Sequence, residues 1–313
     1  MVIIAHQTMQ AINDKMFADQ GAVFRSHLKK LIALADDAYS TDTFPFRSHL
    51  GASGIGEDCA RKLWYAWHWS KEGKHDARII RLFNRGHLEE PRMMALLMMI
   101  GCEVWQLDTN GKQYKITGHS GHYGGSLDGV ALGIPEFPDL PGLVEFKTHS
   151  DKSFNEVKGK SVLLSKPTHF QQMQQYMGYH KLSFGLYMAV NKNTDEIYAE
   201  IIMFNKLYYD KYFERAGKII ESKVPPDKIS KNSKFYTCTY CDFKSICHGK
   251  DLPARNCRTC LHSEAYAGNN NGEWHCVNPL NITVKRNPIV LTKEEQFAGC
   301  DNYEVNPYIK EAL

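Results

Sequence analysis

The sequence has no hydrophobic run that approaches the length of a membrane span. The run Met-Met-Ala-Leu-Leu-Met-Met-Ile at residues 93–100 is well short of the roughly 20 apolar residues that a spanning helix needs. We expect it to be the buried end of a helix. The opening Val-Ile-Ile-Ala is too short for a signal peptide and has no basic flank. These absences predict a protein with no membrane partner and no secretory signal.

A strong net charge is absent as well. The 313 residues carry 38 Lys and Arg against 35 Asp and Glu, which gives a formal net charge of +3. Binding to nucleic acid would therefore depend on a local basic surface rather than on the field of the whole protein. The length and the ordinary composition fit one large domain, or one domain with a small module.

Cysteine, in contrast, is abundant: the chain has nine, and seven of them follow residue 237. Two Cys-x2-Cys pairs, Cys238/Cys241 and Cys257/Cys260, lie in this part of the chain. Without a secretory signal, clustered cysteines at this spacing are typical of metal ligands rather than of disulfides. We therefore predict a reducing, cytoplasmic location.

Residues 126–148 are predicted to form a β-hairpin, because two short apolar runs flank a loop that contains three prolines. Asp128 lies near the start of the first strand, and Glu145 and Lys147 lie two residues apart on the second. Strand side chains alternate, so Glu145 and Lys147 share one face and Phe146 takes the other. Acids on two neighbouring strands can bind one Mg²⁺ or Mn²⁺, with the lysine beside it.

The Asp128 strand, the proline loop and Glu145-Phe146-Lys147 resemble the signature of the PD-(D/E)XK nucleases. Within that superfamily the chain is similar to the RecB-like and AddB-like iron–sulfur branch, which includes CRISPR-associated and phage exonucleases. The resemblance implies that Asp128 and Glu145 hold Mg²⁺ or Mn²⁺, with the Phe146 carbonyl as an added ligand. It implies that Lys147 orients the attacking water. An exposed hairpin face with a surface Glu/Lys pair is the alternative.

A long amphipathic helix is predicted over residues 75–100. Within it, His87 and Glu90 are three residues apart and so share a face. Residues 85–90 resemble the Gly-His…Glu element of the same nucleases. The resemblance implies that His87 and Glu90 are metal ligands, and we prefer Glu90 to its neighbour Glu89. Gly86 and the proline after Glu90 predict a kink or a break in the helix. A histidine on the helix surface beside an acid is the alternative.

A second helix is predicted over residues 167–182, where glutamine and tyrosine recur at helical spacing. Gln172 and Tyr176 lie four residues apart on one face. They resemble the Q-x-x-x-Y element that follows the E-x-K strand in the RecB-like family, which implies a catalytic role beside the metal. The alternatives with the same spacing are Gln171/Gln175 and Gln175/Tyr179.

Cys238, Cys241 and Cys247 form a Cys-x2-Cys-x5-Cys trio, which resembles the carboxy-terminal cluster motif of the iron–sulfur nucleases. Cys59, which we expect inside a short helix capped by Ser53, resembles the first cluster ligand of that branch. The resemblance implies a 4Fe–4S cluster held by Cys59 and the trio. Zn²⁺ is the alternative, because four thiolates suit it equally.

The final residues, 251–313, contain a second set of four cysteines. A module of fewer than about 70 residues rarely folds without a staple, so this set predicts Zn²⁺ in a zinc-ribbon-like module. The expected ligands are Cys257, Cys260, Cys276 and Cys300. His262 or His275 would replace Cys300 if that residue lay too far away. The role of the module is left open between structural support, contact with DNA and binding of a partner.

The order of the predicted elements gives an α/β fold class. The resemblance implies a restriction-endonuclease-like core with a central mixed β-sheet flanked by helices in residues 1–250, plus the cysteine-rich module at 251–313. We predict a mobile polar loop at 149–165. The remaining predicted elements are helices within 1–40 and at 206–222, and strands at 102–108, 113–118, 123–132, 142–148, 184–191 and 196–204.

Together these interpretations predict a metal-dependent DNA nuclease that hydrolyses phosphodiester bonds in DNA recombination or processing, with exonuclease action favoured. The expected partners are DNA ends or single strands and a recombination or single-strand-binding protein, in the cytoplasm of a bacterial or phage-infected cell. One alternative is a non-catalytic nucleic-acid-binding protein on a nuclease-like core with structural metal centres. A weaker one is a zinc-ribbon scaffold that docks on replication proteins. The sequence does not distinguish the polarity of cleavage or the oligomeric state.

Overall fold

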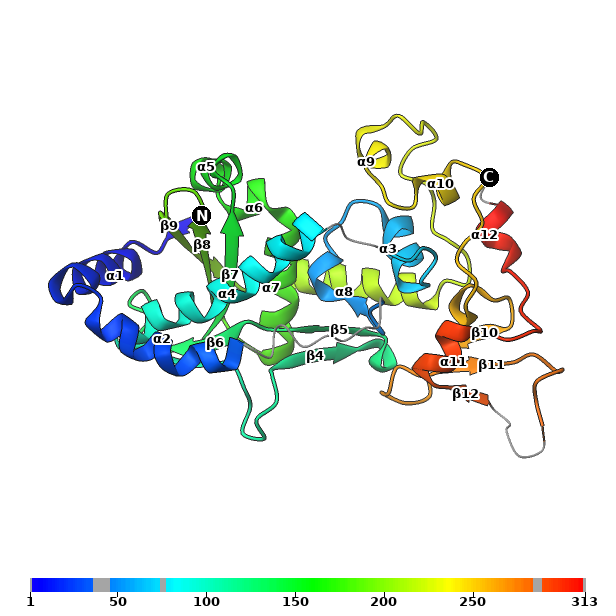
Figure 1. Cartoon of the computed structure of the whole chain (residues 1–313), viewed down its shortest axis with the longest axis horizontal. Helices are drawn as coiled ribbons and strands as arrows, with labels where there is room; N and C mark the ends of the chain where they lie inside the picture. The colour runs from blue at the N-terminus through cyan, green and yellow to red at the C-terminus, as the bar shows by residue number, and fades with distance from the viewer. Residues whose placement is uncertain (1, 36–45, 74–76, 284–288, 312–313) are drawn as a thin grey trace. The chain divides into compact units, whose positions relative to one another are not determined.

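The computed structural model describes residues 2–35, 46–73, 77–283 and 289–311, and Figure 1 labels its helices and strands. The chain divides into two compact units. Unit 1 comprises Met1–Thr43, His75–Ile116 and Ser126–Tyr209. Unit 2 comprises Phe44–Lys74, Thr117–Gly125 and Asp210–Leu313. The domain boundary expected near residue 250 remains a prediction.

Unit 1 is built on a six-stranded mixed sheet with the strand order β1-β9-β8-β7-β6-β3. The neighbours β7 and β8 are parallel, and the other neighbouring pairs are antiparallel. This architecture confirms the predicted α/β class with a central mixed sheet, although the short edge strand β1 was not predicted. The strands are β1 (Ile3–Ile4), β3 (Glu103–Trp105), β6 (Gly129–Leu132), β7 (Gly142–His149), β8 (Phe184–Asn191) and β9 (Ile197–Met203).

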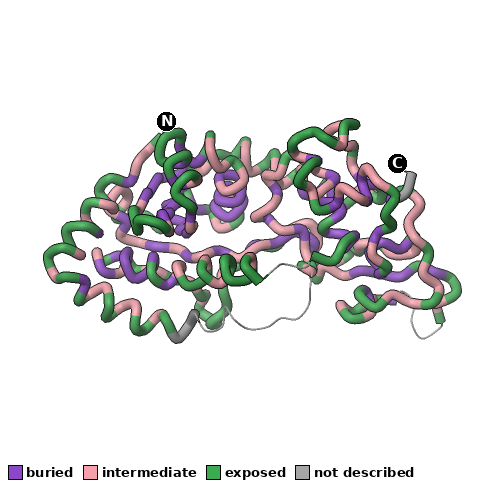
Figure 2. Tube along the Cα trace, turned by 45° about the horizontal axis from the view of Figure 1, so that its top comes forward, coloured by how far each residue is buried: buried purple, intermediate pink, exposed green. Residues whose placement is uncertain are grey.

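Helices pack on the sheet of unit 1, and their outer turns are exposed (Figure 2). Met94 and Leu97 of α4 are buried in one core with Phe146 and Met188 of the sheet. On the side of α7, a Cβ added to Gly185 of β8 would lie only 2.9 Å from Met173 Cε, so helix and strand approach closely there. The helices are α1 (His6–Asp19), α2 (Ala22–Ala35), α4 (Ala77–Met99), α5 (Asp151–Lys160), α6 (Val162–Ser165), α7 (Pro167–His180) and the start of α8 (Lys206–Glu221).

The predicted hairpin is confirmed, because β6 pairs antiparallel with β7. The strands predicted just before it do not all belong to the same sheet, however. β4 (Lys115–Gly118) and β5 (Tyr123–Ser126) form a separate three-stranded sheet with β2 (Leu50–Gly51). The sequence of β5 is Tyr-Gly-Gly-Ser, which offers one large apolar side chain and so provides little surface for packing in the main sheet.

The prediction of a loop at residues 149–165 is wrong, because the structure places α5 and α6 there. Asp151 in the first turn of α5 and Lys158 and Lys160 in its last turn complement the helix dipole. Phe154 and Val157, three residues apart, are fully buried. The high polarity of the segment belongs to the exposed side of an amphipathic helix, and two buried side chains are enough to anchor it.

The break predicted near Gly86 is also absent, since α4 continues through Gly86 and Pro91. Most of the residues after Pro91 in α4 are buried, including Met93 and Leu97, and tertiary packing of this kind can outweigh poor local helix propensity. A Cβ on Gly86 would meet nothing within 4 Å. Packing within the described residues therefore does not require glycine at this position.

Unit 2 contains β2, most of β5 and the part of α8 from Asp210 onward. Its other helices and strands are short: α3 (Ala60–Trp67), α9 (Tyr236–Thr239), α10 (Lys244–Cys247), α11 (Lys293–Ala298), α12 (Pro307–Glu311) and the antiparallel strands β10 (Ser263–Ala265), β11 (Trp274–Cys276) and β12 (Ile289–Leu291). Across both units, none of the helices in the described ranges combines the length and the apolar character that a bilayer span requires.

Arg258 lies at the centre of unit 2 and is almost completely buried. Its guanidinium group lies over the rings of Trp69, at 3.7 Å, and Trp274, at 4.8 Å. It donates hydrogen bonds of 2.9 Å to the carbonyl oxygens of Trp67 and Ser48. One cation therefore joins segments about 200 residues apart in the sequence, through contacts that gain strength where water is excluded.

Candidate functional site

The candidate site of unit 1 begins with the two faces of β7. Val144 and Phe146 lie in the apolar core with side chains of α4. Glu145 is also fully buried, but it contacts Gln172 of α7. The alternation of strand side chains thus separates an apolar face from a polar one, and the polar face carries the acid of the E-x-K motif.

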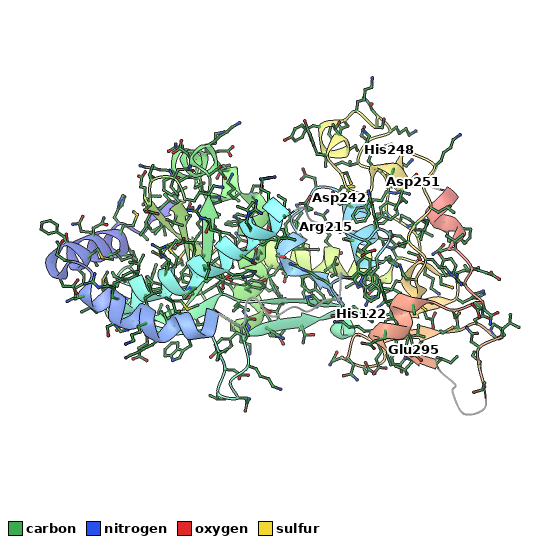
Figure 3. The ribbon with its side chains drawn as sticks, viewed as in Figure 1. His122, Arg215, Asp242, His248, Asp251 and Glu295 are labelled. Atoms are coloured by element: carbon green, nitrogen blue, oxygen red, sulfur yellow. The ribbon has the colours of Figure 1, made fainter. Side chains whose placement is uncertain are left out.

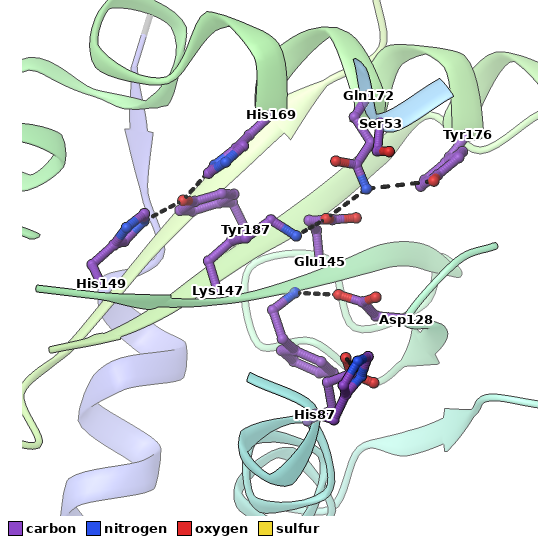
Figure 4. Close-up of polar contacts among 12 residues, drawn as sticks. Ser53, His87, Asp128, Glu145, Lys147, His149, His169, Gln172, Tyr176 and Tyr187 are labelled. Atoms are coloured by element: carbon purple, nitrogen blue, oxygen red, sulfur yellow. Dashed lines mark hydrogen bonds and ion pairs between the residues drawn. The ribbon is translucent and has the colours of Figure 1, made fainter. Parts of the chain in front are cut away.

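Two side chains hold one oxygen of Glu145, as Figure 4 shows. Gln172 Nε2 donates to Glu145 Oε1 at 2.8 Å, and the Lys147 ammonium forms an ion pair with the same oxygen. Gln172 Nε2 also lies 3.4 Å from Tyr176 Oη. The other carboxylate oxygen, Oε2, is buried and forms no hydrogen bond with the described residues. Leaving a buried polar atom unpaired costs roughly 1–3 kcal/mol, so Oε2 is suited to receive a ligand.

Asp128 joins the site through the backbone of β7. Its Oδ2 accepts a hydrogen bond from the Phe146 N–H group at 2.7 Å. The register of the hairpin pairs Gly129 with Val144, which places Asp128 beside the strand that carries Glu145 and Lys147. The fold therefore brings together the three residues that the motif predicted.

The α4 helix contributes a further carboxylate. The charges of Asp128 and Glu145 act on Glu90, whereas Glu89 Oε2 lies 3.6 Å from Arg92 Nε. His87, which is about half exposed, has its Nδ1 atom 3.6 Å from Glu90 Oε1. The structure therefore places Glu90, rather than Glu89, in the acidic group, with His87 at its edge.

Burial and mutual repulsion raise the pKa of both glutamates. The pKa of Glu90 rises to about 8, mainly because the side chain is buried and then because Asp128 is near. Burial likewise raises the pKa of Glu145 to about 7, against the opposing effect of Lys147 and with a further contribution from Asp128. Burial alone would lower the pKa of Lys147, but Glu145 and Asp128 outweigh it and raise that pKa. The carboxylates are therefore unfavourable together in their charged forms, and a bound cation would favour those forms.

Three carboxylates and a backbone carbonyl are the oxygen ligands that Mg²⁺ and Mn²⁺ prefer. The donor set of Asp128, Glu145 and Glu90 therefore fits such a cation chemically, and the unpartnered Oε2 of Glu145 strengthens the fit. Within the described ranges, no three His, Cys, Asp or Glu side chains are arranged so that they could hold a metal ion as they stand. In this arrangement the Lys147 ammonium supplies the balancing positive charge to Glu145.

A polar chain beside Lys147 was missed at the level of sequence. His149 Nε2 and His169 Nδ1 lie 2.7 and 3.0 Å from the hydroxyl oxygen of the fully buried Tyr187 (Figure 4). Burial lowers the pKa of His149 to about 4 and that of His169 to about 3, and nearby lysines act in the same direction. The signal for the histidines was present, because His149 follows Lys147 at strand spacing and His169 precedes Gln172 at helix spacing. Tyr187 required the pairing of β7 with β8, which sets it opposite Glu145.

The four cysteines of the expected iron–sulfur site line one cavity of unit 2. Cys59 directly precedes α3 instead of lying inside it, and Ser53 lies in a separate 3₁₀ turn, Ala52–Gly54, so the predicted cap is wrong. Cys238 lies in α9 and Cys247 ends α10. The fold therefore gathers residues that are almost 190 positions apart in the chain.

Positive charge surrounds this first cavity. Arg61, Lys62, Lys228 and Lys244 are among its lining residues. His248, which Figure 3 labels, lines it as well, but burial and the nearby lysines lower its pKa and favour the neutral ring. Burial raises the pKa of the Cys241 and Cys247 thiols, and the neighbouring cations act in the opposite direction. A cationic wall of this kind favours thiolates, which are the form that binds a metal or a cluster.

The second cysteine set lines another cavity of unit 2, together with His262. Asn281 Nδ2 lies 3.6 Å from Cys276 Sγ and 3.4 Å from Cys300 Sγ, so these two thiols are neighbours. His262 Nε2 lies 3.2 Å from a carboxylate oxygen of Glu304. The His275 ring stacks on Tyr266, with centroids 4.1 Å apart. The structure therefore groups Cys300 with Cys257, Cys260 and Cys276, with His262 at the same cavity and His275 stacked on Tyr266 outside its lining.

Comparison with known proteins gives distant likenesses of fold. No protein-family model matches the sequence, and no curated protein matches it. The structure is similar to that of SSO0001, with 15% identity and a TM-score of 0.39 over 74% of this chain and 96% of that chain. It is similar to an alkaline exonuclease, LHK-Exo from Laribacter hongkongensis, with 16% identity and a TM-score of 0.40 over 55% of this chain and 86% of that chain. LHK-Exo in complex with dAMP gives 14% identity and a TM-score of 0.39 with the same coverage.

Proposed function

We propose that this chain is a metal-dependent DNA nuclease that hydrolyses phosphodiester bonds. More narrowly, the proposed enzyme is an exonuclease of DNA recombination or processing, built on a restriction-endonuclease-like core. The observation that carries the proposal is the state of Glu145, which is buried beside Asp128 with Oε1 held by Lys147 and Gln172 and with Oε2 unpartnered. A buried acid with one restrained and one open oxygen is what a metal ligand requires.

Asp128 and Glu145 would hold Mg²⁺ or Mn²⁺, with the Phe146 carbonyl as an added ligand and with Glu90 and His87 beside them. When bound, the cation would supply a water of lowered pKa and would screen negative charge on the scissile phosphate. The raised pKa values of Glu90 and Glu145 support this assignment, because the two carboxylates are unfavourable together without a positive partner.

The side chains around the carboxylates have separate roles in the proposal. Lys147 remains protonated because its pKa is raised, so its ammonium can orient the attacking water and offset negative charge on the phosphate. Gln172 restrains Glu145 through the hydrogen bond to Oε1. Tyr176 contacts Gln172 and so keeps the amide in place.

The two cysteine cavities are proposed as structural metal centres. Cys59, Cys238, Cys241 and Cys247 would hold a 4Fe–4S cluster, with Zn²⁺ as the alternative. Cys257, Cys260, Cys276 and Cys300 would hold Zn²⁺ in the carboxy-terminal module. The support is that each set lines a single cavity, although the sequence positions of its members are far apart.

The test is cleavage of end-labelled single- and double-stranded DNA with Mg²⁺, with Mn²⁺ and with neither, using protein purified without oxygen. We expect Glu145→Gln and Lys147→Ala each to slow cleavage by at least about 100-fold, while DNA binding and folding remain close to wild type. The label pattern gives the polarity, and the visible absorption of the protein reports an iron–sulfur cluster.

Lys158 and Glu196 provide a matched control, because they form an ion pair on the surface of the same unit, about half exposed. Lys158→Ala and Glu196→Gln should cleave at the wild-type rate. Wild-type cleavage by Glu145→Gln would refute the site assignment. A wild-type protein that binds DNA but is inert with both metals would instead favour the non-catalytic binding protein.

A further inference from the structure

Residues 223–250 of unit 2, here named the lysine–tyrosine segment, have a composition unlike that of the whole chain. The segment contains six lysines and two aspartates, a formal charge of +4, whereas the 313 residues together carry +3. Lys231, Lys234 and Lys250 are exposed, and none of them forms an ion pair with a described carboxylate. Positive charge is therefore concentrated here, and within the segment Lys223 forms an ion pair with Glu264 at 3.8 Å.

Two tyrosines of the segment are unusually exposed. Tyr236 and Tyr240 each have 78% of their surface accessible, and Phe235 between the lysines and the tyrosines has 42%. Tyrosine rings normally bury most of their apolar area. The rings of Tyr236 and Tyr240 form an edge-to-face pair with centroids 5.6 Å apart and an angle of 68° between their planes. Such a pair leaves ring faces open to a ligand.

The backbone under these rings is fixed. Tyr236 begins α9 (see Figure 1), and Cys238 and Thr239 donate backbone hydrogen bonds to the Phe235 carbonyl at 2.9 Å. Cys238 and Cys241 of the same short stretch line the first cysteine cavity, whereas the two tyrosines are largely exposed. A rigid support reduces the entropy lost when a flexible ligand binds to exposed side chains.

We propose that Tyr236 and Tyr240 form a stacking platform for the bases of single-stranded DNA, and that Lys231 and Lys234 contact its phosphates. Exposed aromatic faces flanked by unpaired lysines match both parts of a single strand, its bases and its backbone. Duplex DNA offers the phosphates alone, because its bases are already stacked inside. The choice of DNA rests on the proposed nuclease function, and the platform extends that function by specifying the form of the substrate.

The experiment measures binding of fluorescein-labelled dT30 to the full-length protein by anisotropy, in buffer without added Mg²⁺ or Mn²⁺. Tyr236→Ala/Tyr240→Ala should weaken binding by at least about tenfold, since each stacked base contributes substantially. Tyr236→Phe/Tyr240→Phe should restore it, because a phenyl ring also stacks. Lys231→Gln/Lys234→Gln should reduce the slope of log affinity against log salt concentration by about 1.4, the value for two phosphates of a single strand.

Two controls separate the platform from general effects. Lys29 and Lys30 are exposed lysines of α2, and Lys29→Gln/Lys30→Gln should leave the salt slope unchanged. The double alanine variant should bind a capped 30-base-pair duplex as the wild type does, and its metal content should equal that of the wild type. The proposal is overturned if the alanine variant binds dT30 with wild-type affinity, or if it loses duplex binding to the same extent. Because the assay measures binding alone, it decides the platform even if the protein cleaves nothing.

Discussion

The two units of this protein stabilise their interiors by different means. Unit 1 buries methionine, leucine and phenylalanine side chains of α4 and of the six-stranded sheet in one apolar core. Unit 2 has three-residue strands and packs tryptophan rings around the guanidinium of Arg258, beside two cavities lined by cysteines. Unit 1 gains stability from the area that it buries, whereas unit 2 depends on a few specific contacts.

This difference also separates the two kinds of proposed chemistry. Of the carboxylates of unit 1, Glu145 lies on β7, Asp128 directly precedes β6 and Glu90 lies on α4, so elements of the apolar core fix all three. The cysteines of unit 2 lie in or beside short elements, such as Cys247 at the end of α10 and Cys276 at the end of β11. A bound metal would thus add a reactive group to unit 1, but would hold together the framework of unit 2.

The largest expected effect follows from removing Cys276, one of the four cysteines proposed to hold a metal in unit 2. Cys276→Ser should release the metal of the second cavity, and the amides of β10, β11 and β12 should lose protection in hydrogen exchange, while those of β7 and β8 keep theirs. Structural zinc contributes on the order of 10 kcal/mol to small modules, which exceeds the stability of most domains.

Cys102 supplies the matched control for this change. It lies in unit 1, outside both cysteine cavities, and its thiol donates a hydrogen bond to the Gly133 carbonyl at 3.2 Å. Cys102→Ser should leave the metal content and the protection of β10–β12 unchanged. Equal protection of these strands in Cys276→Ser and in the wild type would show that unit 2 does not need the metal.

A smaller effect is expected in the pH dependence of stability, which a buried histidine should give to unit 2. His68 of unit 2 is buried, and its ring stacks on Trp64 with centroids 3.6 Å apart. Burial, helped by the charge of Arg258, lowers the pKa of His68 to about 3. The unfolded chain, with a pKa near 6.5, therefore binds more protons than the folded one between those values, and stability falls as the pH falls through this window.

Lowering the pH from 7 to 5 should therefore reduce the free energy of unfolding of the wild type by about 2 kcal/mol through this histidine. His68→Phe should lack that part of the pH dependence, and urea unfolding followed by tryptophan fluorescence measures it. Four of the five tryptophans, Trp64, Trp67, Trp69 and Trp274, belong to unit 2, so the signal reports mainly that unit. His6→Phe, at an exposed position of unit 1, is the control. If the free energy of unfolding of His68→Phe depends on pH as that of the wild type does, folding does not keep the His68 ring neutral.

The sequence was informative where local pattern controls the outcome. Two apolar runs and the proline loop between them sufficed to predict the hairpin. The four-residue spacing on α7 was ambiguous, and the resemblance selected Gln172 and Tyr176, which contact each other in the structure. The Cys-x2-Cys spacings and, for Cys59, the family resemblance indicated two cysteine sets, which line two cavities. The spacings are signals within a few residues of chain, whereas Cys59 was assigned through the resemblance.

The sequence failed where long-range contacts decide. Arg258 was not singled out, because its partners Ser48 and Trp67 come from a distant segment. Tyr187 became part of the site through the parallel pairing of β7 with β8, which no local pattern encodes. At 149–165, polarity suggested a loop because the two apolar anchors, Phe154 and Val157, were too few to reveal a helical face.

The smallest expected effect tests whether a glycine of unit 1 serves packing or something else. Gly178 of α7 has a packing role, because an added Cβ would lie 2.2 Å from Tyr209 Cδ2, and Gly178→Ala should cost about 1–3 kcal/mol. Gly86 of α4 has open space around it, so Gly86→Ala should raise the free energy of unfolding by about 1 kcal/mol through helix propensity alone. Urea unfolding followed by circular dichroism measures both changes.

If Gly86→Ala stabilises the fold but slows DNA cleavage, the glycine is there for close approach of the substrate next to His87. If it destabilises the fold, the space around Gly86 is needed by the protein itself, and the contrast between the two glycines fails.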